Sequence, residues 1–268
     1  MSVALRILVL AISCSVWLIE AASARSLDMV RAAGALHLCA HPNSLPYASK
    51  AGNPPGFQPE LGRALAKELG VTLVTEWIVV PSQAFRAGCD IILDAIADPE
   101  AQADTGLQIS KPYYRSGVGL AVPRGSPITT FAGLNDHTKV GVQVGSVAAM
   151  LLNRQHVRTS TFGFEEDMLE ALAAGEIDAA AVSPLSAGLY VHDIGARQHG
   201  NLNHPSQGFA IVSPDETAGD LVWNEAVGIR QPDDKLRDAI DAALDRLRAE
   251  GTITTIYSKY GVALIPPR

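Results

Sequence analysis

The chain has little basic charge, few aromatic residues and few cysteines. Its 268 residues include 21 Lys and Arg against 28 Asp and Glu, which gives a formal net charge of −7. Because contacts to phosphate come mainly from Lys and Arg, an acidic chain without basic runs is a poor candidate for binding nucleic acid. Aromatic residues make up only 6% of the chain, which also argues against stacking platforms for bases.

Several motifs of catalytic and metal sites are missing as well. The sequence has no Gly-rich phosphate loop, no Gly-x-Ser-x-Gly elbow and no His-Glu-x-x-His segment. His192, Asp193, His199 and His204 have a spacing that fits no metal-binding motif, so we expect a solvated loop there. We therefore predict a protein without catalytic residues, metal or cofactor.

Apolar residues are what the chain has in quantity. They make up 47% of the sequence, against 18% charged residues, so the chain can bury a large core and is not a disordered protein. A length of 268 residues favours about two domains.

Residues 1–24 have the pattern of a secretory signal peptide. Arg6 gives the positive start, Ile7–Ile19 is nearly unbroken apolar sequence, and Ala22-Ser23-Ala24 forms a cleavage pattern. A membrane anchor is the alternative, but the apolar run is shorter than the roughly 20 residues that a spanning helix needs. We predict export to the periplasm and no membrane insertion after cleavage.

Two cysteines, Cys39 and Cys89, follow the signal peptide, whereas Cys14 lies within it. Two cysteines in an oxidising compartment suggest one disulfide. Each lies in or beside an apolar, strand-like run, and neighbouring parallel strands could bring them into range. Two buried free thiols are the alternative.

Strand-like and helix-like segments alternate along the chain. We predict strands over 36–40, 71–80 and 90–93, helices over 59–69 and 82–87, and an extended run over 113–123. After a loop over 124–135, we predict strands over 139–144 and 177–182 and helices over 147–154, 165–174 and from Pro184 onward. The tail adds a strand over 223–229, an amphipathic helix with Leu236, Ile240, Leu244 and Leu247, and a short helix over 253–260.

This order predicts an α/β fold with two lobes and a ligand cleft between them, because alternating strands and helices form parallel sheets. We expect lobe one to be discontinuous, over residues 34–124 and 215–264, and lobe two to cover residues 125–214. Ligands of α/β folds bind at the carboxyl ends of parallel strands, which is where the cleft would lie.

The candidate cleft residues follow strand ends or lie near the hinge. Ser146 begins a predicted helix whose backbone N–H groups could bind an anion, although a plain N-cap explains it equally well. His41 and Asn43 follow the first strand and could line the cleft, but turn formation explains these residue types as well. Tyr113 and Tyr114 could line the cleft near the hinge or pack in the core. The expected site residues are His41, Asn43, Tyr47, Asp94, Tyr113, Tyr114, Arg115, Ser146 and Ser183.

Four segments in this order resemble periplasmic solute-binding proteins of family 3, the polar amino-acid type. They are Gly56–Leu61 (GFQPEL), Ser110–Tyr114 (SKPYY), Val140–Ser146 (VGVQVGS) and Ala174–Ala179 (AGEIDA). Together they cover about residues 34–262. The resemblance implies a two-lobed, type II periplasmic binding protein-like fold that closes on a small-molecule ligand and delivers it to an ABC permease.

Two ligand anchors of that family are missing here. The segment Ile96–Asp104, before SKPYY, has no Arg that could hold a ligand carboxylate through a bidentate fork. Ser183 stands where the resemblance implies an Asp that pairs with the ligand ammonium, and a neutral hydroxyl cannot replace that charge. The two losses together predict a different ligand, or none.

Other segments resemble the quinoprotein dehydrogenase-associated (MxaJ-like) subfamily. They are Cys39–Tyr47, Ala87–Asp90, Pro112–Ser116 and Tyr260–Val262. This resemblance implies that Cys39 and Cys89 are paired. It also implies a non-enzymatic assembly or activation partner of a periplasmic, PQQ-dependent alcohol or methanol dehydrogenase.

Three functional hypotheses follow, in this order. The first is the dehydrogenase partner. The alternative is the substrate-binding component of an ABC transporter for a polar amino acid or another small solute. The third is an enzyme such as a dehydratase of small carboxylates, which would need Asp94 or Asp98 as its acid or base.

Overall fold

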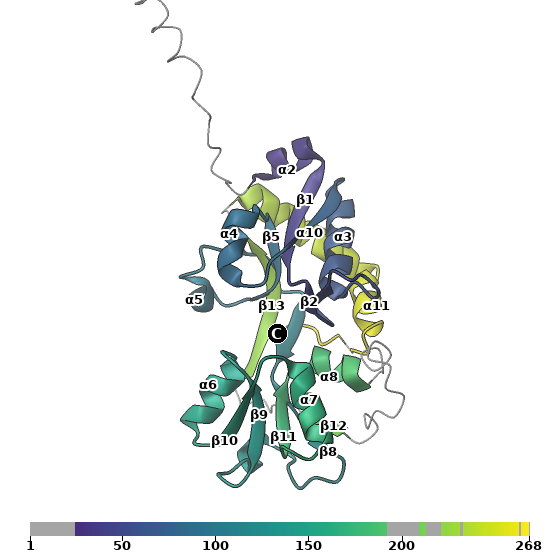
Figure 1. Ribbon diagram of the computed structural model, residues 1–268. Coiled ribbons are helices and arrows are strands. Elements are labelled where there is room, and N and C mark those ends of the chain that lie inside the picture. The colour runs from purple at the N-terminus through teal and green to yellow at the C-terminus, as the bar shows by residue number, and fades with distance from the viewer. Residues whose placement is uncertain (1–24, 192–208, 213–220, 231–232, 263, 268) are drawn as a thin grey trace, which may run out of the picture.

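The computed structural model describes residues 25–191, 209–212, 221–230, 233–262 and 264–267. They form two α/β lobes, each built on its own sheet, and segments near residues 117 and 222 connect the lobes (Figure 1). The expected signal peptide and the segment with His192, Asp193, His199 and His204 lie outside the described residues. Within the described ranges, no helix combines the length and apolarity that crossing a bilayer requires.

The first lobe is built on a sheet with the strand order β4-β1-β5-β13-β6. The parallel strands that the sequence predicts are β1 (Ala35–Ala40), β4 (Thr72–Trp77) and β5 (Ile91–Ile96). Antiparallel to β5 runs β13 (Val222–Ile229), which also pairs with β6 (Gln108–Ile109) and β7 (Tyr114–Gly117). The other elements are α2 (Leu27–Ala33), β2 (Asn43–Ser44), β3 (Ala48–Ser49), α3 (Phe57–Glu68), η1 (Pro81–Gln83), α4 (Ala84–Ala87), α5 (Pro99–Gln102), α10 (Asp234–Ala249) and α11 (Thr252–Ser258).

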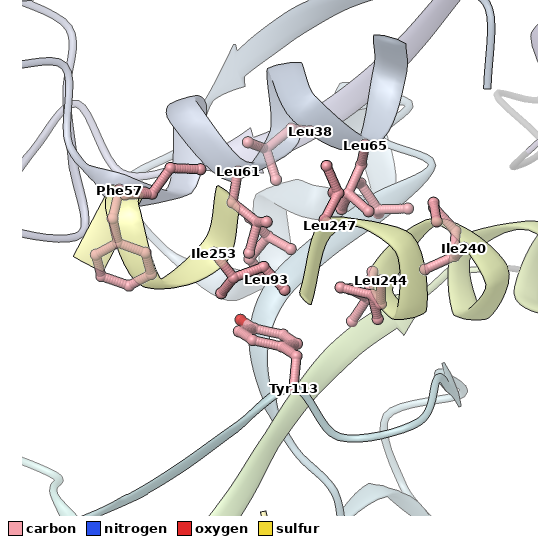
Figure 2. Close-up of a cluster of buried hydrophobic side chains, with 14 of the residues drawn as sticks. Leu38, Phe57, Leu61, Leu65, Leu93, Tyr113, Ile240, Leu244, Leu247 and Ile253 are labelled. Carbon is pink, nitrogen blue, oxygen red and sulfur yellow. The ribbon is translucent and has the colours of Figure 1, made fainter. Parts of the chain in front are cut away.

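The core of this lobe lies where α3 and α10 cover the sheet. Figure 2 shows Leu61 and Leu65 of α3 facing Leu244 and Leu247 of α10, with Leu38 of β1 in the same cluster. All five side chains are buried, and burying a leucine stabilises the folded state by roughly 1.5–3 kcal/mol. The predicted apolar stripes of these two helices are therefore the faces that build the core.

The second lobe is built on a sheet with the strand order β10-β9-β11-β8-β12. The parallel strands are β9 (Lys139–Gln143), β10 (Arg158–Phe162) and β11 (Ala179–Val182), while β8 (Gly119–Pro123) runs antiparallel to β11 and to β12 (Phe209–Val212). The helices are η2 (Phe131–Gly133), α6 (Val147–Arg154), α7 (Glu165–Ala173) and α8 (Pro184–Val191). Our sequence analysis did not predict β10 and β12.

The border between the lobes lies earlier in the chain than expected. We placed it near residue 125, but β8 belongs to the second sheet, so the chain leaves the first sheet between Gly117 and Gly119. A Cβ on Gly117 would lie 2.4 Å from the carbonyl oxygen of Leu221, so the two connecting segments are in close contact. The run over 113–123 is extended on both sides of Val118, which is why the sequence pattern does not show this change of partner.

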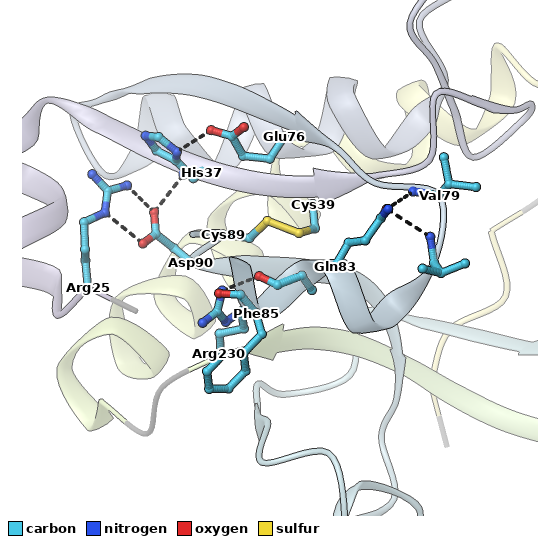
Figure 3. The surroundings of a disulfide bond; sticks show 12 residues. Arg25, His37, Cys39, Glu76, Val79, Gln83, Phe85, Cys89, Asp90 and Arg230 are labelled. Atoms are coloured by element: carbon cyan, nitrogen blue, oxygen red, sulfur yellow. Dashed lines mark hydrogen bonds and ion pairs between the residues drawn. A yellow bond between two sulfur atoms is a disulfide. The ribbon is translucent and has the colours of Figure 1, made fainter. Parts of the chain in front are cut away.

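Cys39 and Cys89 form a disulfide, with their Cα atoms 5.5 Å apart, which confirms the predicted pair. Cys39 lies in β1 and Cys89 lies two residues before β5, and these two strands are parallel neighbours. Figure 3 shows the adjacent Asp90, which is fully buried and accepts hydrogen bonds from Arg25 Nε (3.0 Å) and from the backbone N–H of His37 (2.8 Å). The disulfide and this carboxylate together fix the start of the described chain to the first sheet.

Candidate functional site

A cavity of about 200 Å³ lies between the two lobes, beside the connecting segments. The first lobe lines it with Tyr47 from the β2–β3 connection, Ser116 from β7, and Trp223 and Glu225 from β13. The second lobe lines it with Gln143, Ser146, Glu165 and Ser183, which follow strands or begin helices. Residues that are far apart in sequence therefore meet at the carboxyl ends of β9 and β11, where α/β folds bind ligands.

A second cavity, of about 360 Å³, lies next to the first. Trp223 and Val147 line both cavities, so the two spaces meet at the indole ring. The second cavity is bounded by Ile96, Asp98 and Asn224, among others. Asp98 caps α5 by accepting hydrogen bonds from the backbone N–H groups of Glu100 (2.7 Å) and Ala101 (3.1 Å), so its carboxylate already has a structural role.

Glu225 is the most deeply buried carboxyl group that lines the first cavity. Only 6% of the residue is exposed, because it lies in β13 between β5 and β7. Its Oε1 accepts a hydrogen bond from Trp223 Nε1 at 2.9 Å, whereas Oε2 has no hydrogen-bond partner among the described residues. Burial, and then the nearby charge of Asp94, raise the pKa of Glu225 to about 8. At neutral pH this carboxyl group therefore keeps its proton in most molecules.

Asp94 lies in β5 and lines neither cavity. Its Oδ1 accepts a hydrogen bond from the hydroxyl of Tyr113 at 2.6 Å, and its Oδ2 accepts one from Gln58 Nε2 at 2.5 Å. Burial raises the pKa of Asp94 to about 6, although both hydrogen bonds oppose the shift. Asp94 also has a φ of 59°, which is uncommon for a residue other than glycine. The two donors hold this carboxyl group against the first lobe, so it adds negative charge near Glu225 without lining the cavity.

Glu165 brings a carboxyl group to the cavity from the second lobe. It is the first residue of α7, and it accepts hydrogen bonds from the backbone N–H (2.8 Å) and the hydroxyl (3.0 Å) of Ser183. Burial raises its pKa above the usual value. Ser183, which we expected to leave this place without a charge, therefore holds a carboxyl group that the sequence analysis did not select. The sequence signal for Glu165 was its position at the start of the predicted helix over 165–174.

The structure brings three of the nine expected site residues together in the cavity: Tyr47, Ser146 and Ser183. The hydroxyl of Ser146 accepts a hydrogen bond from Ala149 N at 3.1 Å and so caps α6, as its position predicts. Asp94 lines neither cavity but acts electrostatically on Glu225. The other five residues line neither cavity.

Those five residues have other surroundings. Tyr113 and Tyr114 are fully buried in the core of the first lobe, where Tyr114 packs against Tyr257 with the ring centroids 5.0 Å apart. Arg115 pairs through its backbone N–H with the carbonyl oxygen of Ile265 at 2.9 Å. His41 and Asn43 interact with each other, since Asn43 N donates to His41 Nδ1 at 3.1 Å. The surroundings of His41 and Asn43 agree with a turn, and those of Tyr113 and Tyr114 agree with core packing.

The charge in this region is of one sign. In the described part of the chain, no Lys, Arg or His lines either cavity, and no group of three or more potential metal ligands occurs. The described residues can therefore offer carboxyl groups, hydroxyl groups and aromatic rings to a ligand, but no cationic side chain to pair with a carboxylate.

The model of one protein family matches most of the chain. It is the model of bacterial extracellular solute-binding proteins, family 3, which matches residues 36–263. The chain belongs to this family. The match confirms the resemblance to solute-binding proteins of family 3.

Two relatives of this solute-binding protein illustrate the similarity. It is 22% identical over 217 residues to a probable histidine-binding protein of Neisseria gonorrhoeae, a match that covers 78% of this chain and 75% of the relative. It is 25% identical over 219 residues to the L-arginine-binding protein of Pseudomonas aeruginosa, which covers 76% of this chain and 78% of the relative.

Solved structures confirm the two-lobed, type II periplasmic binding fold. An ancestral cationic amino acid solute-binding protein (AncCDT-1) superposes with a TM-score of 0.72 at 21% identity, covering 88% of this chain and 99% of that one. The unliganded, open L-cystine receptor of Neisseria gonorrhoeae gives a TM-score of 0.67 at 18% identity, covering 91% and 100%. None of the relatives named here carries a name that points to a dehydrogenase, so these comparisons do not support the MxaJ-like assignment.

Proposed function

We propose that this solute-binding protein is the substrate-binding component of a periplasmic ABC transporter for a small solute. The observation that carries the proposal is the cavity between the lobes, which both lobes line with polar side chains. Relatives named for histidine and L-arginine binding support transport over partnership with a dehydrogenase. The transport function that we gave as an alternative thus becomes the leading one.

A thermal-shift screen tests ligand capture directly. The protein purified after export is heated with amino acids, small organic acids, sugars and amines, each at several millimolar. A ligand at about 100 times its dissociation constant stabilises the folded state by roughly 2.7 kcal/mol, so the melting temperature should rise clearly for at least one class. A flat response to the whole panel would contradict the proposal.

A transport assay then tests the partner. Deletion of the gene should abolish uptake of the solute found in the screen, and restoring the gene should recover it. Uptake that is unchanged in the deletion strain would exclude an ABC permease as the partner for that solute.

A second candidate is the non-enzymatic partner of a PQQ-dependent dehydrogenase. Two observations favour it: the Cys39–Cys89 disulfide, and the lack of any cation for a carboxylate in either described cavity. If it holds, a quinoprotein dehydrogenase should co-purify with the exported protein, and periplasmic alcohol oxidation should fall on deletion. Normal alcohol oxidation in the deletion strain, with no co-purifying dehydrogenase, would remove this candidate.

Binding without turnover is part of the proposal. Asp98 caps a helix and Asp94 accepts two hydrogen bonds, so both candidate carboxyl groups already have structural partners. Incubation of the pure protein with small carboxylates should therefore leave them unchanged. Release of a dehydrated product would establish the enzymatic hypothesis instead.

A further inference from the structure

We propose that the cavity between the lobes binds an organic cation, with an ammonium or guanidinium group and no carboxylate. This inference rests on the proposed function and names its ligand class. It places a cationic group of the ligand next to Glu225 of the first lobe and Glu165 of the second.

Glu225 supplies the first argument, because its Oε2 is buried and unpartnered. The residue is 6% exposed, and Oε2 has no hydrogen-bond partner among the described residues. Leaving a buried acceptor without a partner is costly, and Glu225 lines the cavity, so a ligand donor that reaches this carboxyl group would gain a favourable partner. A charged N–H donor is the strongest partner that a carboxylate can have.

Glu165 supplies the second argument, because it lines the same cavity from the opposite lobe. Its two oxygens are fixed by Ser183 N and Ser183 Oγ, so the carboxyl group is held in place. A cation between Glu165 and Glu225 would be attracted to both lobes at once. This attraction to both carboxyl groups would favour closure of the two lobes on a bound cation.

The aromatic side chains complete the fit to an organic cation. Tyr47 and Trp223 line the same cavity, and the faces of such rings attract ammonium and guanidinium groups. A metal ion is the other kind of cation, but no group of three or more potential metal ligands occurs among the described residues. At about 200 Å³, the cavity is smaller than the roughly 300 Å³ at which typical ligand pockets begin, so it suits a small amine.

No cationic side chain among the described lining residues can pair with a ligand carboxylate. No Lys, Arg or His of the described chain lines either cavity, and the charge of Asp94 acts on Glu225. An amino acid would therefore bring its carboxylate near three carboxyl groups without a compensating cation. Because this repulsion acts on the carboxylate alone, a ligand without that group should bind better than the amino acid.

Matched ligand pairs give the decisive experiment. Agmatine is L-arginine without its carboxylate, and cadaverine is L-lysine without its carboxylate. Isothermal titration of the exported protein at pH 8 should give a dissociation constant at least tenfold lower for one of these amines than for its amino acid. An amino acid that binds as tightly as its amine would overturn the inference and leave the proposed function standing.

Two variants and a control locate the site. Glu225→Gln and Glu165→Gln keep the shape of each side chain but remove the carboxyl group that can ionise beside a cation, so each should weaken amine binding at least tenfold. Glu170→Gln makes the same change at an exposed position of α7 and should leave the affinity unchanged. Amine binding that is unaffected by both site variants would exclude this cavity.

A measurement on the unchanged protein guards against a variant that misfolds. Glu225 interacts electrostatically with Asp94 and with the hydroxyl groups of Tyr47, Tyr113, Tyr114 and Tyr257. Raised pKa values keep these four tyrosines neutral. An ammonium group beside Glu225 would lower its pKa, so binding near pH 7 should release a proton. Titration in buffers of different ionisation enthalpy measures that proton, and its absence would contradict placement beside Glu225.

The outcomes separate the two levels of the argument. Binding of amines only, with proton release, supports both the inference and the proposed function. Binding of amino acids, sugars or organic acids in preference to amines overturns the inference alone. If no compound in the panel binds, the proposed function is overturned, and so is the inference about its ligand.

Discussion

The side chain of Glu225 makes the stability of the protein depend on pH. In the unfolded chain a glutamate has a pKa near 4.5, whereas burial raises the pKa of Glu225 to about 8 in the fold. Between these values the unfolded chain has lost the proton that the folded protein keeps, so stability falls as the pH rises through this window. Below pH 4.5 both states are protonated, and Glu225 adds no pH dependence.

Replacement of this carboxyl group should remove that penalty. We expect Glu225→Gln to be more stable than the unchanged protein at pH 8, by an amount on the order of a few kcal/mol. At pH 5 the difference should be small. Urea unfolding at pH 5, 6.5 and 8 measures the trend, and parallel curves for the two proteins would show that Glu225 is ionised in the fold.

At the residue scale, the sequence predicted only part of the site. Ser146 and Ser183 could be selected because each follows a predicted strand. Glu225 could not, because it lies inside a strand whose apolar neighbours indicate a core position. The proximity of Glu165 and Glu225 depends on how the two lobes meet, which no local pattern in either segment contains.

The hairpin of β2 and β3 positions Tyr47, and Gly56 positions the hairpin. A Cβ on Gly56 would lie 2.4 Å from the carbonyl oxygen of Tyr47 and 2.5 Å from Ala48 Cα, and its φ is 93°. Gly56→Ala should therefore destabilise the fold by at least about 2 kcal/mol and reduce the thermal shift with any ligand. Thermal unfolding with and without ligand measures both effects.

Gly52 provides the matched control for Gly56. It has a similar φ of 88°, but the nearest atom to an added Cβ is 3.8 Å away. Gly52→Ala should cost only the backbone strain, about 1–2 kcal/mol, and should leave ligand binding unchanged. Equal losses of stability and binding in the two variants would show that the contact with Tyr47 is unimportant.

The disulfide joins β1 to the chain just before β5 and closes a loop with a sequence separation of 50 residues. On the chain-entropy estimate, such a cross-link stabilises the fold by roughly 4 kcal/mol. The double variant Cys39→Ala/Cys89→Ala should lose stability of that order in urea unfolding. In the exported protein, thiol labelling after unfolding should detect no free cysteine, and two labelled thiols would contradict the bond.

At the element scale, strongly periodic segments could be predicted and short polar ones could not. Both α3 and α10 could be predicted from the apolar residues on one face of each helix. Leu61 and Leu65, and Ile240 and Leu244, repeat at helical spacing. β10 has the sequence RTSTF, with no fully buried residue, so it lacks the apolar alternation that identifies a strand. It is placed by its pairing with β9, which is a tertiary contact.

At the scale of the whole molecule, α8 of the second lobe packs against the C-terminal tail of the first. Leu185 and Leu189 of α8 share a core cluster with Val262. A Cβ on Gly188 would lie 3.0 Å from the carbonyl oxygen of Gly261 and 3.0 Å from Val262 Cγ2. This close approach connects the lobes at a second place, away from the segments near residues 117 and 222.

Enlarging Gly188 should disturb the arrangement of the lobes. Alanine is usually favoured over glycine in a helix, but here Gly188→Ala should destabilise the protein by about 1–3 kcal/mol through overpacking. It should also change the small-angle X-ray scattering profile. Gly163→Ala, whose Cβ would meet nothing within 4 Å, is the control. A more stable Gly188→Ala variant with unchanged scattering would contradict the contact.

The position of β13 late in the chain determines the order in which the lobes can form. β5 pairs with β1 on one side and needs β13, residues 222–229, on the other. During synthesis and passage across a membrane, the amino-terminal part emerges first, so the first sheet stays open at β5 until the last quarter of the chain follows. Every described strand of the second sheet precedes β13 in the chain, so the lobe that begins second can finish first. The Cys39–Cys89 bond lies within the first third of the chain. It could keep β1 next to β5 before β13 has been synthesised.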